Sequence, residues 1–390
     1  MLACLVFSGC SLFEHSATCT TRKLIPPESF QLNAEAERPD FCHYQGALAA
    51  WYVPYAIMSL NAYRPDGLDD MTADRTESCQ DQTNKVRCPE AWVGSRLGEE
   101  GRYFEANNRA TGLFMESFER EYTDESRKTR HVEYVLAFRG SEFTDVSDWR
   151  ANFRWFMPGL RAGDEYPEAR QTSVEWVASA CRGLGTDFDQ LDVTMAGHSL
   201  GGGLAQNAGY AVARALQPGL APASGELSDQ ERKEQELLAA CPQEKVRVRV
   251  VAFDPSPVTG YRDEQGLPRC ENPLSRRCRA PIIMRLYEKG EILAPLRRVV
   301  SWFNPLWPNI CEDRYSSAPG GPWHLPITQH QMRRLAGGLV WMARTSGDPD
   351  AISIYDQYCP QGKDTPSRDP VLHREPLLDC GQPEFDCSAD

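Results

Sequence analysis

The sequence lacks an excess of basic residues, a repeated motif and the composition of a membrane protein. Its 42 lysines and arginines are outnumbered by 55 aspartates and glutamates, so the net charge is −13. A nucleic-acid-binding surface needs a concentration of positive charge, and we therefore exclude a nucleic-acid partner. No motif recurs at a fixed period, which argues against a solenoid. The share of hydrophobic residues, 41%, is that of a globular protein and disfavours a polytopic membrane protein.

The sequence also lacks C-x-x-C spacing, which disfavours a zinc site and a redox-active dithiol. We accordingly expect no metal. Cysteine itself is abundant, with 14 residues, and most of them lie in polar segments. Three pairs stand seven to nine residues apart, namely Cys79/Cys88, Cys270/Cys278 and Cys380/Cys387. This usage predicts loops and a tail that are stapled by disulfides, in an oxidising compartment.

The chain begins with a short apolar stretch, MLACLVFSGC. We expect residues 1–9 to be the end of a secretory signal peptide, and residues 10–43 to be a polar tether that carries the lipid anchor. F-S-G-C resembles a bacterial lipobox, which would place a lipid on Cys10, although Phe7 stands where leucine is usual. Loss of Cys4 and lipidation of Cys10 would leave 12 cysteines, an even number. The alternative is a plain signal peptide with a stray cysteine.

The rest of the chain divides into a domain over residues 44–345 and an irregular tail, rich in cysteine and proline, over residues 346–390. Four runs predict strands, at Val132–Phe138, Leu191–Ala196, Val246–Phe253 and Ile282–Tyr287. Helical patterns occur at Tyr44–Tyr63, Gln171–Cys181, Leu204–Leu216, Gln230–Ala240 and Gln329–Arg344. Strands that alternate with helices predict an α/β fold with a mainly parallel central sheet and helices on both faces.

A serine stands in the sequence G-H-S-L-G, between a predicted strand and a predicted helix. G-x-S-x-G in this context is typical of a nucleophile elbow, where a strained turn lifts the serine hydroxyl above the edge of the sheet. A Cβ atom at Gly197 or Gly201 would meet the neighbouring strand or helix. We predict that Ser199 is a nucleophile. The adjacent His198 would point away from the hydroxyl, so we expect a packed histidine and not the catalytic base.

A second motif, F-R-G-S, ends the predicted strand Val132–Phe138 and is followed by D-W. Together with G-H-S-L-G-G it resembles the class 3 (fungal-type) lipases, over about residues 44 to 345. The resemblance implies an α/β-hydrolase fold and hydrolysis of ester bonds in acyl lipids, without a cofactor. It also implies two oxyanion donors, Ser141 through its N–H and hydroxyl and Leu200 through its backbone N–H.

The resemblance places an acid after the strand Ile282–Tyr287. Glu291, in E-I-L, stands where the family usually has aspartate. Two other carboxylates follow predicted strands and remain alternatives, Asp254 and Glu288. In each case the order along the chain is serine, acid, histidine, as this fold requires.

The resemblance places the catalytic histidine just before the last helix. H-Q-M-x-x-L-A, which begins at His330, is similar to the family's histidine motif, and His324 is the alternative. The predicted triad is thus Ser199, His330 and Glu291. His330 would take the proton of Ser199 and pass it to the leaving alcohol, and the acid would orient the imidazole.

Aromatic residues follow Ser141 among charged ones, at Phe143, Trp149, Phe153, Trp155 and Phe156. We expect this segment to be a lid that opens on a lipid surface, with a permanently packed core helix as the alternative. Three functions fit. They are a lipase or phospholipase anchored to the bacterial outer membrane or secreted, a secreted phospholipase toxin or effector, and a non-catalytic surface binding module. The intact elbow argues against the third.

Overall fold

The computed structural model describes parts of the chain from residue 41 onward. The described residues are 41–63, 86, 88–89, 92–94, 105–107, 113–124, 128–140, 165–185, 187–217, 227–257, 281–288, 293, 310–315, 331–359 and 378. Only the backbone is described for residues 41–45, 105–107, 288 and 310–315. The signal peptide, nearly all of the tether and the lipidation site Cys10 lie outside this part and stay predictions.

The described residues contain eight strands in one sheet. They are β1 (Val93–Gly94), β2 (Glu105–Asn107), β3 (Phe114–Asp124), β4 (Thr129–Phe138), β5 (Gln190–His198), β6 (Val246–Phe253), β7 (Ile282–Glu288) and β8 (Ile310–Tyr315). The order is β1-β3-β4-β5-β6-β7-β8, and β2 also pairs with β3. Strands β4 to β8 are parallel, whereas the pairings of β3 are antiparallel. This confirms the predicted mainly parallel sheet.

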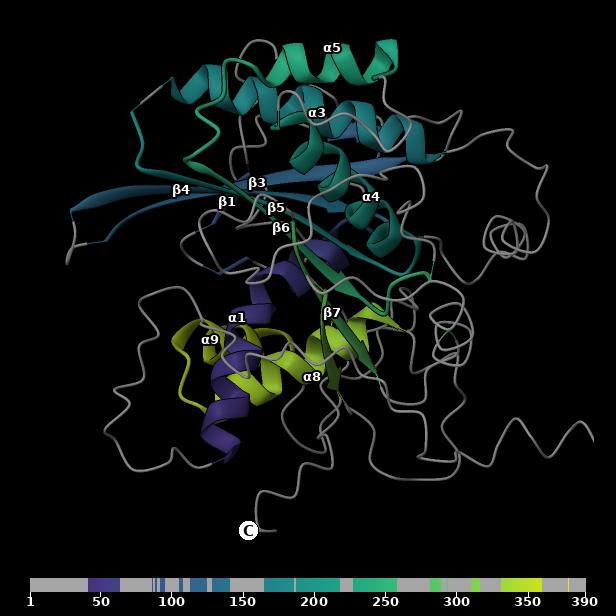
Figure 1. The fold of residues 1–390 in the computed structure, drawn as a ribbon. Helices are drawn as coiled ribbons and strands as arrows, with labels where there is room; N and C mark the ends of the chain where they lie inside the picture. Colours follow the sequence, from purple (N-terminus) through teal and green to yellow (C-terminus); the bar gives the residue numbers. More distant parts are fainter. Residues whose placement is uncertain are drawn as a thin grey trace, which may run out of the picture.

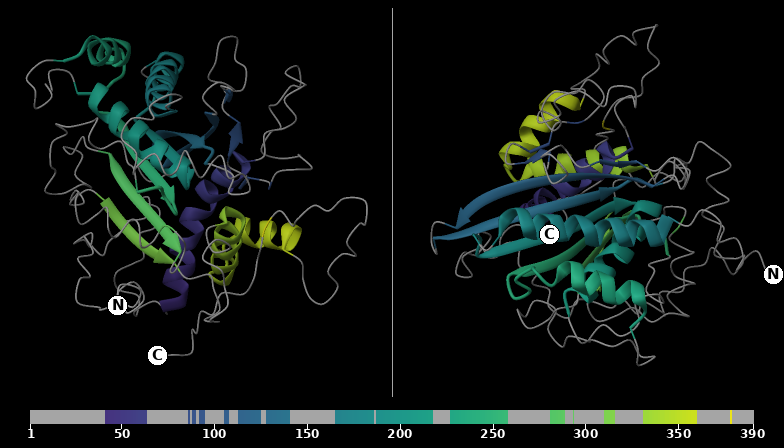
Figure 2. Two further views of the ribbon diagram at one scale, coloured as in Figure 1. Left: turned by 90° about the vertical axis from the view of Figure 1, so that its right-hand side faces the viewer. Right: turned by 90° about the horizontal axis from the view of Figure 1, so that it is seen from above.

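The central strands are apolar on both faces because helices cover both faces of the sheet. Side chains alternate along a strand, so Val193 and Met195 of β5 face one side while Ala196 faces the other, and all three are buried. Helices α3 (Glu165–Leu184) and α4 (Leu200–Ala215) pack on the first face, with α5 (Asp229–Leu238) beyond them. Helices α1 (Phe41–Asn61), α8 (Met332–Thr345) and α9 (Pro349–Tyr358) form the second layer (Figures 1 and 2). The fold is α/β-hydrolase-like.

Helix α1 is surrounded by other elements. The consecutive residues Ala56, Ile57 and Met58 point in different directions around the helix, yet all three are fully buried. The sheet and α8 share one hydrophobic cluster with this helix. Among the described helices none is long and apolar enough to cross a membrane.

A buried group of charges lies between α1 and the sheet. Glu133 of β4 is 1% exposed, and its carboxylate accepts hydrogen bonds from Tyr55 of α1 at 2.6 Å and from the Arg120 guanidinium at 2.6 and 3.0 Å. Arg249 of β6 lies 3.7 Å away. Burial raises the pKa of the Glu133 carboxyl, but the two arginines and these hydrogen bonds outweigh it, so the pKa lies below its ordinary value.

The C-terminal region differs from the predicted irregular tail, because α9 lies within it. The side chain of Asp348 accepts a hydrogen bond from the amide of Ala351 at 2.8 Å, and Pro349 occupies the first helical position. An aspartate followed by proline is a helix-start signal, and the prediction of an irregular tail did not take it into account. Ala351 and Ile354 are buried in the core that α1 and α8 share.

Strands β3 and β8 were also missed in the sequence. β3 reads FMESFEREYTD, in which charged residues are mixed with apolar ones. An antiparallel strand near a sheet edge tolerates such a mixture, whereas the sequence prediction rested on the apolar runs that are typical of buried parallel strands. β8, with the sequence ICEDRY, carries too few apolar residues for either pattern.

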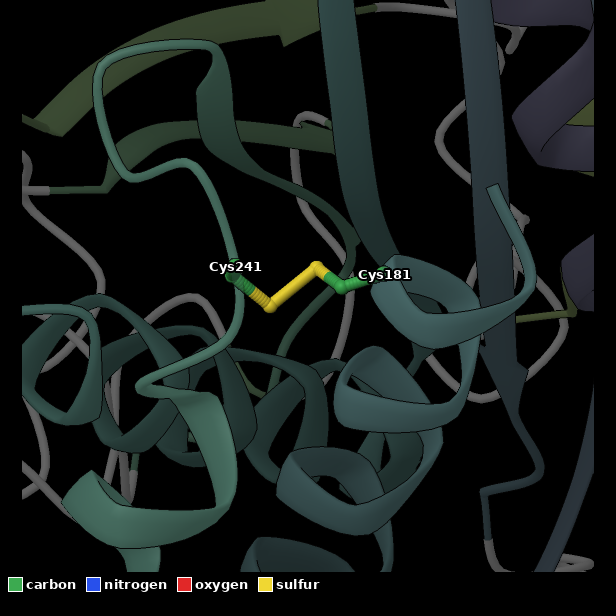
Figure 3. The surroundings of a disulfide bond; sticks show 2 residues. All are labelled: Cys181 and Cys241. Carbon is green, nitrogen blue, oxygen red and sulfur yellow. A yellow bond between two sulfur atoms is a disulfide. The ribbon is translucent and has the colours of Figure 1, made fainter. Parts of the chain in front are cut away.

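Disulfides are present, as the cysteine usage predicted. Cys181, in the last turn of α3, is bonded to Cys241, which follows α5, across 60 residues of sequence (Figure 3). Cys88 and Cys359 are also disulfide-bonded. The Cys181–Cys241 bridge joins two buried, distant positions, so it is not one of the short pairs that the sequence brought to notice. Cys181 precedes β5 and Cys241 precedes β6, so the bridge links the two segments that lead into these strands.

Candidate active site

The turn from β5 to α4 holds Ser199 in an unusual conformation. Its φ is 57° and its ψ is −122°, and α4 begins at the next residue, Leu200. A non-glycine residue with positive φ is strained, and such strain persists only where the surroundings impose it. The serine is fully buried, and its side chain does not cap α4. This is the backbone geometry that the G-x-S-x-G motif predicts.

The glycines on either side of the serine are required by close contacts. A Cβ atom at Gly197 would collide with the backbone of Gly201, the second residue of α4. A Cβ at Gly201 would collide with the carbonyl of Phe138 and lie 2.9 Å from the amide nitrogen of Gly140. The start of α4 therefore sits directly against the end of β4, and only glycine permits this approach.

The backbone of Ser199 is also fixed by the end of β6. Its amide donates to the carbonyl of Phe253 at 3.0 Å, and its carbonyl accepts from the amides of Ser256 at 2.8 Å and Gly203 at 3.2 Å. These bonds join the elbow to the segment after β6 and to the first turn of α4. They hold the strained residue in place.

One of the two predicted oxyanion donors, Leu200, belongs to the elements that meet here. β4 and β5 are parallel, with Phe138 paired with Gly197, so Gly140 lies against the elbow. A Cβ atom on Gly140 would be 3.2 Å from the Cβ of Ser199. Ser141, the next residue, lies outside the described residues. Leu200 opens α4, where backbone N–H groups and the helix dipole favour a negative charge.

His198 is a packed histidine, as its position before the serine predicted. It is 2% exposed, and its Nδ1 lies 2.8 Å from the hydroxyl of Tyr63. Tyr63 follows α1 and was not singled out in the sequence. It is one of four tyrosines in the predicted helix Tyr44–Tyr63, and no spacing distinguishes it from the others.

Of the three candidate acids, the structure brings Asp254 next to the elbow. It directly follows β6, has a φ of 40° and is fully buried, and its amide donates to the carbonyl of Leu286 at 2.8 Å. Glu288 ends β7, but its side chain is not described. Glu291 lies outside the described residues.

The remaining predicted site residues also lie outside the described residues. They are the histidines His330 and His324 and the aromatic lid residues Phe143, Trp149, Phe153, Trp155 and Phe156. Helix α8 begins at Met332, two residues after His330 in the sequence. Within the described ranges, no cluster of histidine, cysteine, aspartate and glutamate could hold a metal ion.

Comparison with known proteins identifies one related family. A family model described as "Phospholipase-like: Tle-like phospholipase domain" matches residues 97–231. The matched segment includes β4, the elbow and α4, and it ends before Asp254. No curated protein matches the chain. The match supports a phospholipase or lipase family and a lipid-hydrolysing activity for this chain.

Proposed function

We propose that this protein is a serine phospholipase that cleaves carboxylic ester bonds of membrane phospholipids through an acyl-enzyme on Ser199. One observation carries the proposal. A strained, buried serine lies between the end of β5 and the start of α4, inside the segment that matches a phospholipase family. The phospholipase match favours phospholipids over triacylglycerol as the substrate. The resemblance of F-R-G-S and G-H-S-L-G-G to class 3 lipases supports the same chemistry.

The proposed reaction uses the chain's own residues. His330 removes the proton of the Ser199 hydroxyl as the oxygen attacks the ester carbonyl. The resulting oxyanion accepts hydrogen bonds from the backbone N–H groups of Leu200 and Ser141. The His330 imidazolium, oriented by Glu291 or Asp254, then protonates the leaving alcohol. Water, deprotonated by the same histidine, releases the fatty acid and regenerates the serine.

Burial of Ser199 has a consequence for how the substrate reaches it. The side chain is 0% exposed, so an ester bond makes contact only after some covering segment moves. We propose that the aromatic segment after Ser141 is this cover and that it moves aside on a lipid surface. A lipid on Cys10 would keep the protein at such a surface. Activity on an ester should then rise sharply once the substrate forms vesicles or micelles.

The test is release of fatty acid from phosphatidylcholine vesicles and, separately, from a triolein emulsion. The wild type is compared with Ser199→Ala and with Ser173→Ala, a control in which an equally buried serine hydroxyl donates to the Ala169 carbonyl of its own helix. We expect Ser199→Ala to be inactive, Ser173→Ala to be active, and vesicles to be preferred. Activity that survives in Ser199→Ala would refute the proposal, and a preference for triolein would refute the substrate class.

A further inference from the structure

The hydroxyl of Tyr63 makes two contacts with His198, the residue before Ser199. The Tyr63 oxygen lies 2.8 Å from Nδ1 of the His198 ring and 3.3 Å from the His198 backbone carbonyl oxygen. The two rings meet edge to face, with centroids 5.7 Å apart. Tyr63 is thereby joined to both the side chain and the backbone of one residue in the elbow.

The chemistry of the groups assigns the protons. A tyrosine hydroxyl donates one hydrogen and accepts at its lone pairs, and a carbonyl only accepts. Both contacts are satisfied when the Tyr63 hydroxyl donates to the His198 carbonyl and Nδ1–H of the ring donates to the hydroxyl. Donation from the hydroxyl to Nδ1 would leave the carbonyl contact without a hydrogen. The geometry thus favours an imidazole with its proton on Nδ1.

The same hydroxyl lies against the end of β4. A Cβ atom added to Gly140 would collide with the Tyr63 oxygen and with the His198 carbonyl. The segment after α1, the end of β4 and the end of β5 therefore meet at one hydroxyl group. Two of these segments carry the proposed chemistry, since β5 leads into Ser199 and β4 leads towards Ser141.

We propose that Tyr63 is a positioning residue for the reaction. Its hydroxyl holds the peptide before Ser199 against Gly140 and so sets the distance between the nucleophile and the oxyanion donors. A shift of about 1 Å in such a distance can reduce the rate on the order of 100-fold. This inference rests on the proposed function, because it assigns Tyr63 a role in that same site.

Tyr55 offers a matched control. It lies in α1, the helix that Tyr63 follows, its hydroxyl also bonds a group on the sheet, and it is buried. Its partner is Glu133, five residues before the end of β4 and away from the elbow. Tyr55→Phe and Tyr63→Phe each remove one hydroxyl that links the α1 segment to the sheet. Only the second removal touches the elbow.

The experiment measures kcat, KM and the melting temperature of the full chain for the wild type, Ser199→Ala and the two tyrosine variants, with a soluble p-nitrophenyl ester. We expect Tyr63→Phe to lower kcat about 10-fold or more, with KM within about twofold and nearly the wild-type melting temperature. Tyr55→Phe should keep kcat and lose melting temperature. An inactive Ser199→Ala beside a Tyr63→Phe with wild-type kcat would refute this inference alone, and an active Ser199→Ala would refute the proposed function.

A second measurement separates positioning from general support of the fold. If Tyr63 acts through His198, the double variant Tyr63→Phe/His198→Leu should lose less kcat than the product of the two single losses. Losses that multiply would show that the two residues act independently, which would overturn the inference. The inference would also be overturned if kcat fell in parallel with the melting temperature, and to the same degree, in both Tyr55→Phe and Tyr63→Phe.

Discussion

The backbone amide of Ser256 donates a hydrogen bond to the backbone carbonyl of Ser199 at 2.8 Å. The amide of Ser199 in turn donates to Phe253 at 3.0 Å, so the segment after β6 and the elbow are held together on both sides of the serine. Asp254 lies inside this segment. Its carboxylate is therefore carried by the same rigid unit as the proposed nucleophile, although the sequence resemblance favours Glu291 as the acid.

The identity of the acid follows from two substitutions. We predict that Glu291→Gln lowers kcat about 10³- to 10⁴-fold, because an amide cannot stabilise the imidazolium that forms in the transition state. Asp254→Asn should retain more activity per folded molecule than Glu291→Gln. It should lower the melting temperature, because the side chain of Asp254 is fully buried. Steady-state kinetics with a short-chain ester and thermal unfolding provide both values. The reverse pattern, with an unchanged melting temperature in Asp254→Asn, would assign the acid to Asp254.

Gly201→Ala should damage the elbow by steric contact. The added Cβ would meet Phe138 and Arg139 at the end of β4. This contact forces α4, which carries the proposed donor Leu200, away from the segment that leads to the proposed donor Ser141. We expect a loss of about 1 to 3 kcal/mol in the free energy of unfolding, and a fall in kcat larger than this loss explains.

The control for this prediction is Gly185→Ala. Gly185 has a φ of +61° and is exposed, and a Cβ atom there would have no neighbour within 4 Å. Its replacement should cost about 1 kcal/mol from backbone strain alone and leave kcat unchanged. Equal kcat values in the two alanine variants would contradict the proposed contact between α4 and β4 as a determinant of rate.

The buried carboxylate of Glu133 makes stability depend on acid pH. Its pKa is lowered in the folded protein, so it stabilises the fold above its unfolded pKa of about 4.3, and this contribution is lost as the pH falls through the folded value. Glu133→Gln leaves Arg120 and Arg249 without their shared carboxylate, and we expect a loss of about 3 to 5 kcal/mol at neutral pH.

Urea unfolding between pH 7 and about pH 3 measures both effects of this substitution. The wild type should lose stability in the acid range more steeply than Glu133→Gln, because the glutamine has no proton to gain. Parallel pH profiles for the two proteins would show that Glu133 is not a source of the acid sensitivity.

The bridge between Cys181 and Cys241 should stabilise the fold without supporting the chemistry. It closes a loop of 60 residues, for which chain entropy predicts about 4 kcal/mol. Its two cysteines precede the starts of β5 and β6, whereas Ser199 follows the end of β5. The double variant Cys181→Ser/Cys241→Ser should unfold at a lower temperature and keep its kcat at a temperature where it remains folded. A lost kcat in the folded double variant would contradict this separation of roles.

The parts of the fold that the sequence predicted are those with a strong local signal. β6 has the predicted bounds, Val246–Phe253, because the short valine-rich segment VRVRVVAF strongly favours a strand. The elbow was predicted because Gly197 and Gly201 are required by contacts that no other residue permits. At such positions the residue type itself indicates the structural requirement.

Other features depend on contacts between distant segments and leave little local trace. Tyr63 and His198 are 135 residues apart, and their hydrogen bond arises only when α1 packs beside β5. Cys181 and Cys241 are joined across 60 residues, and nothing in their flanking sequence pairs them. β3 was missed because its many charged residues suit an antiparallel strand near the sheet edge and lack the apolar run of a buried parallel strand.

The most direct test of the account is covalent labelling of the full chain with a fluorophosphonate, which traps a serine that attacks an electrophilic centre. The labelled protein is digested, and the modified peptide is identified by mass spectrometry for the wild type, Ser199→Ala and Ser173→Ala. We predict a single label on Ser199 in the wild type and in Ser173→Ala, and none in Ser199→Ala. A label on another serine, or equal labelling of Ser199→Ala, would contradict the claim that Ser199 is the nucleophile.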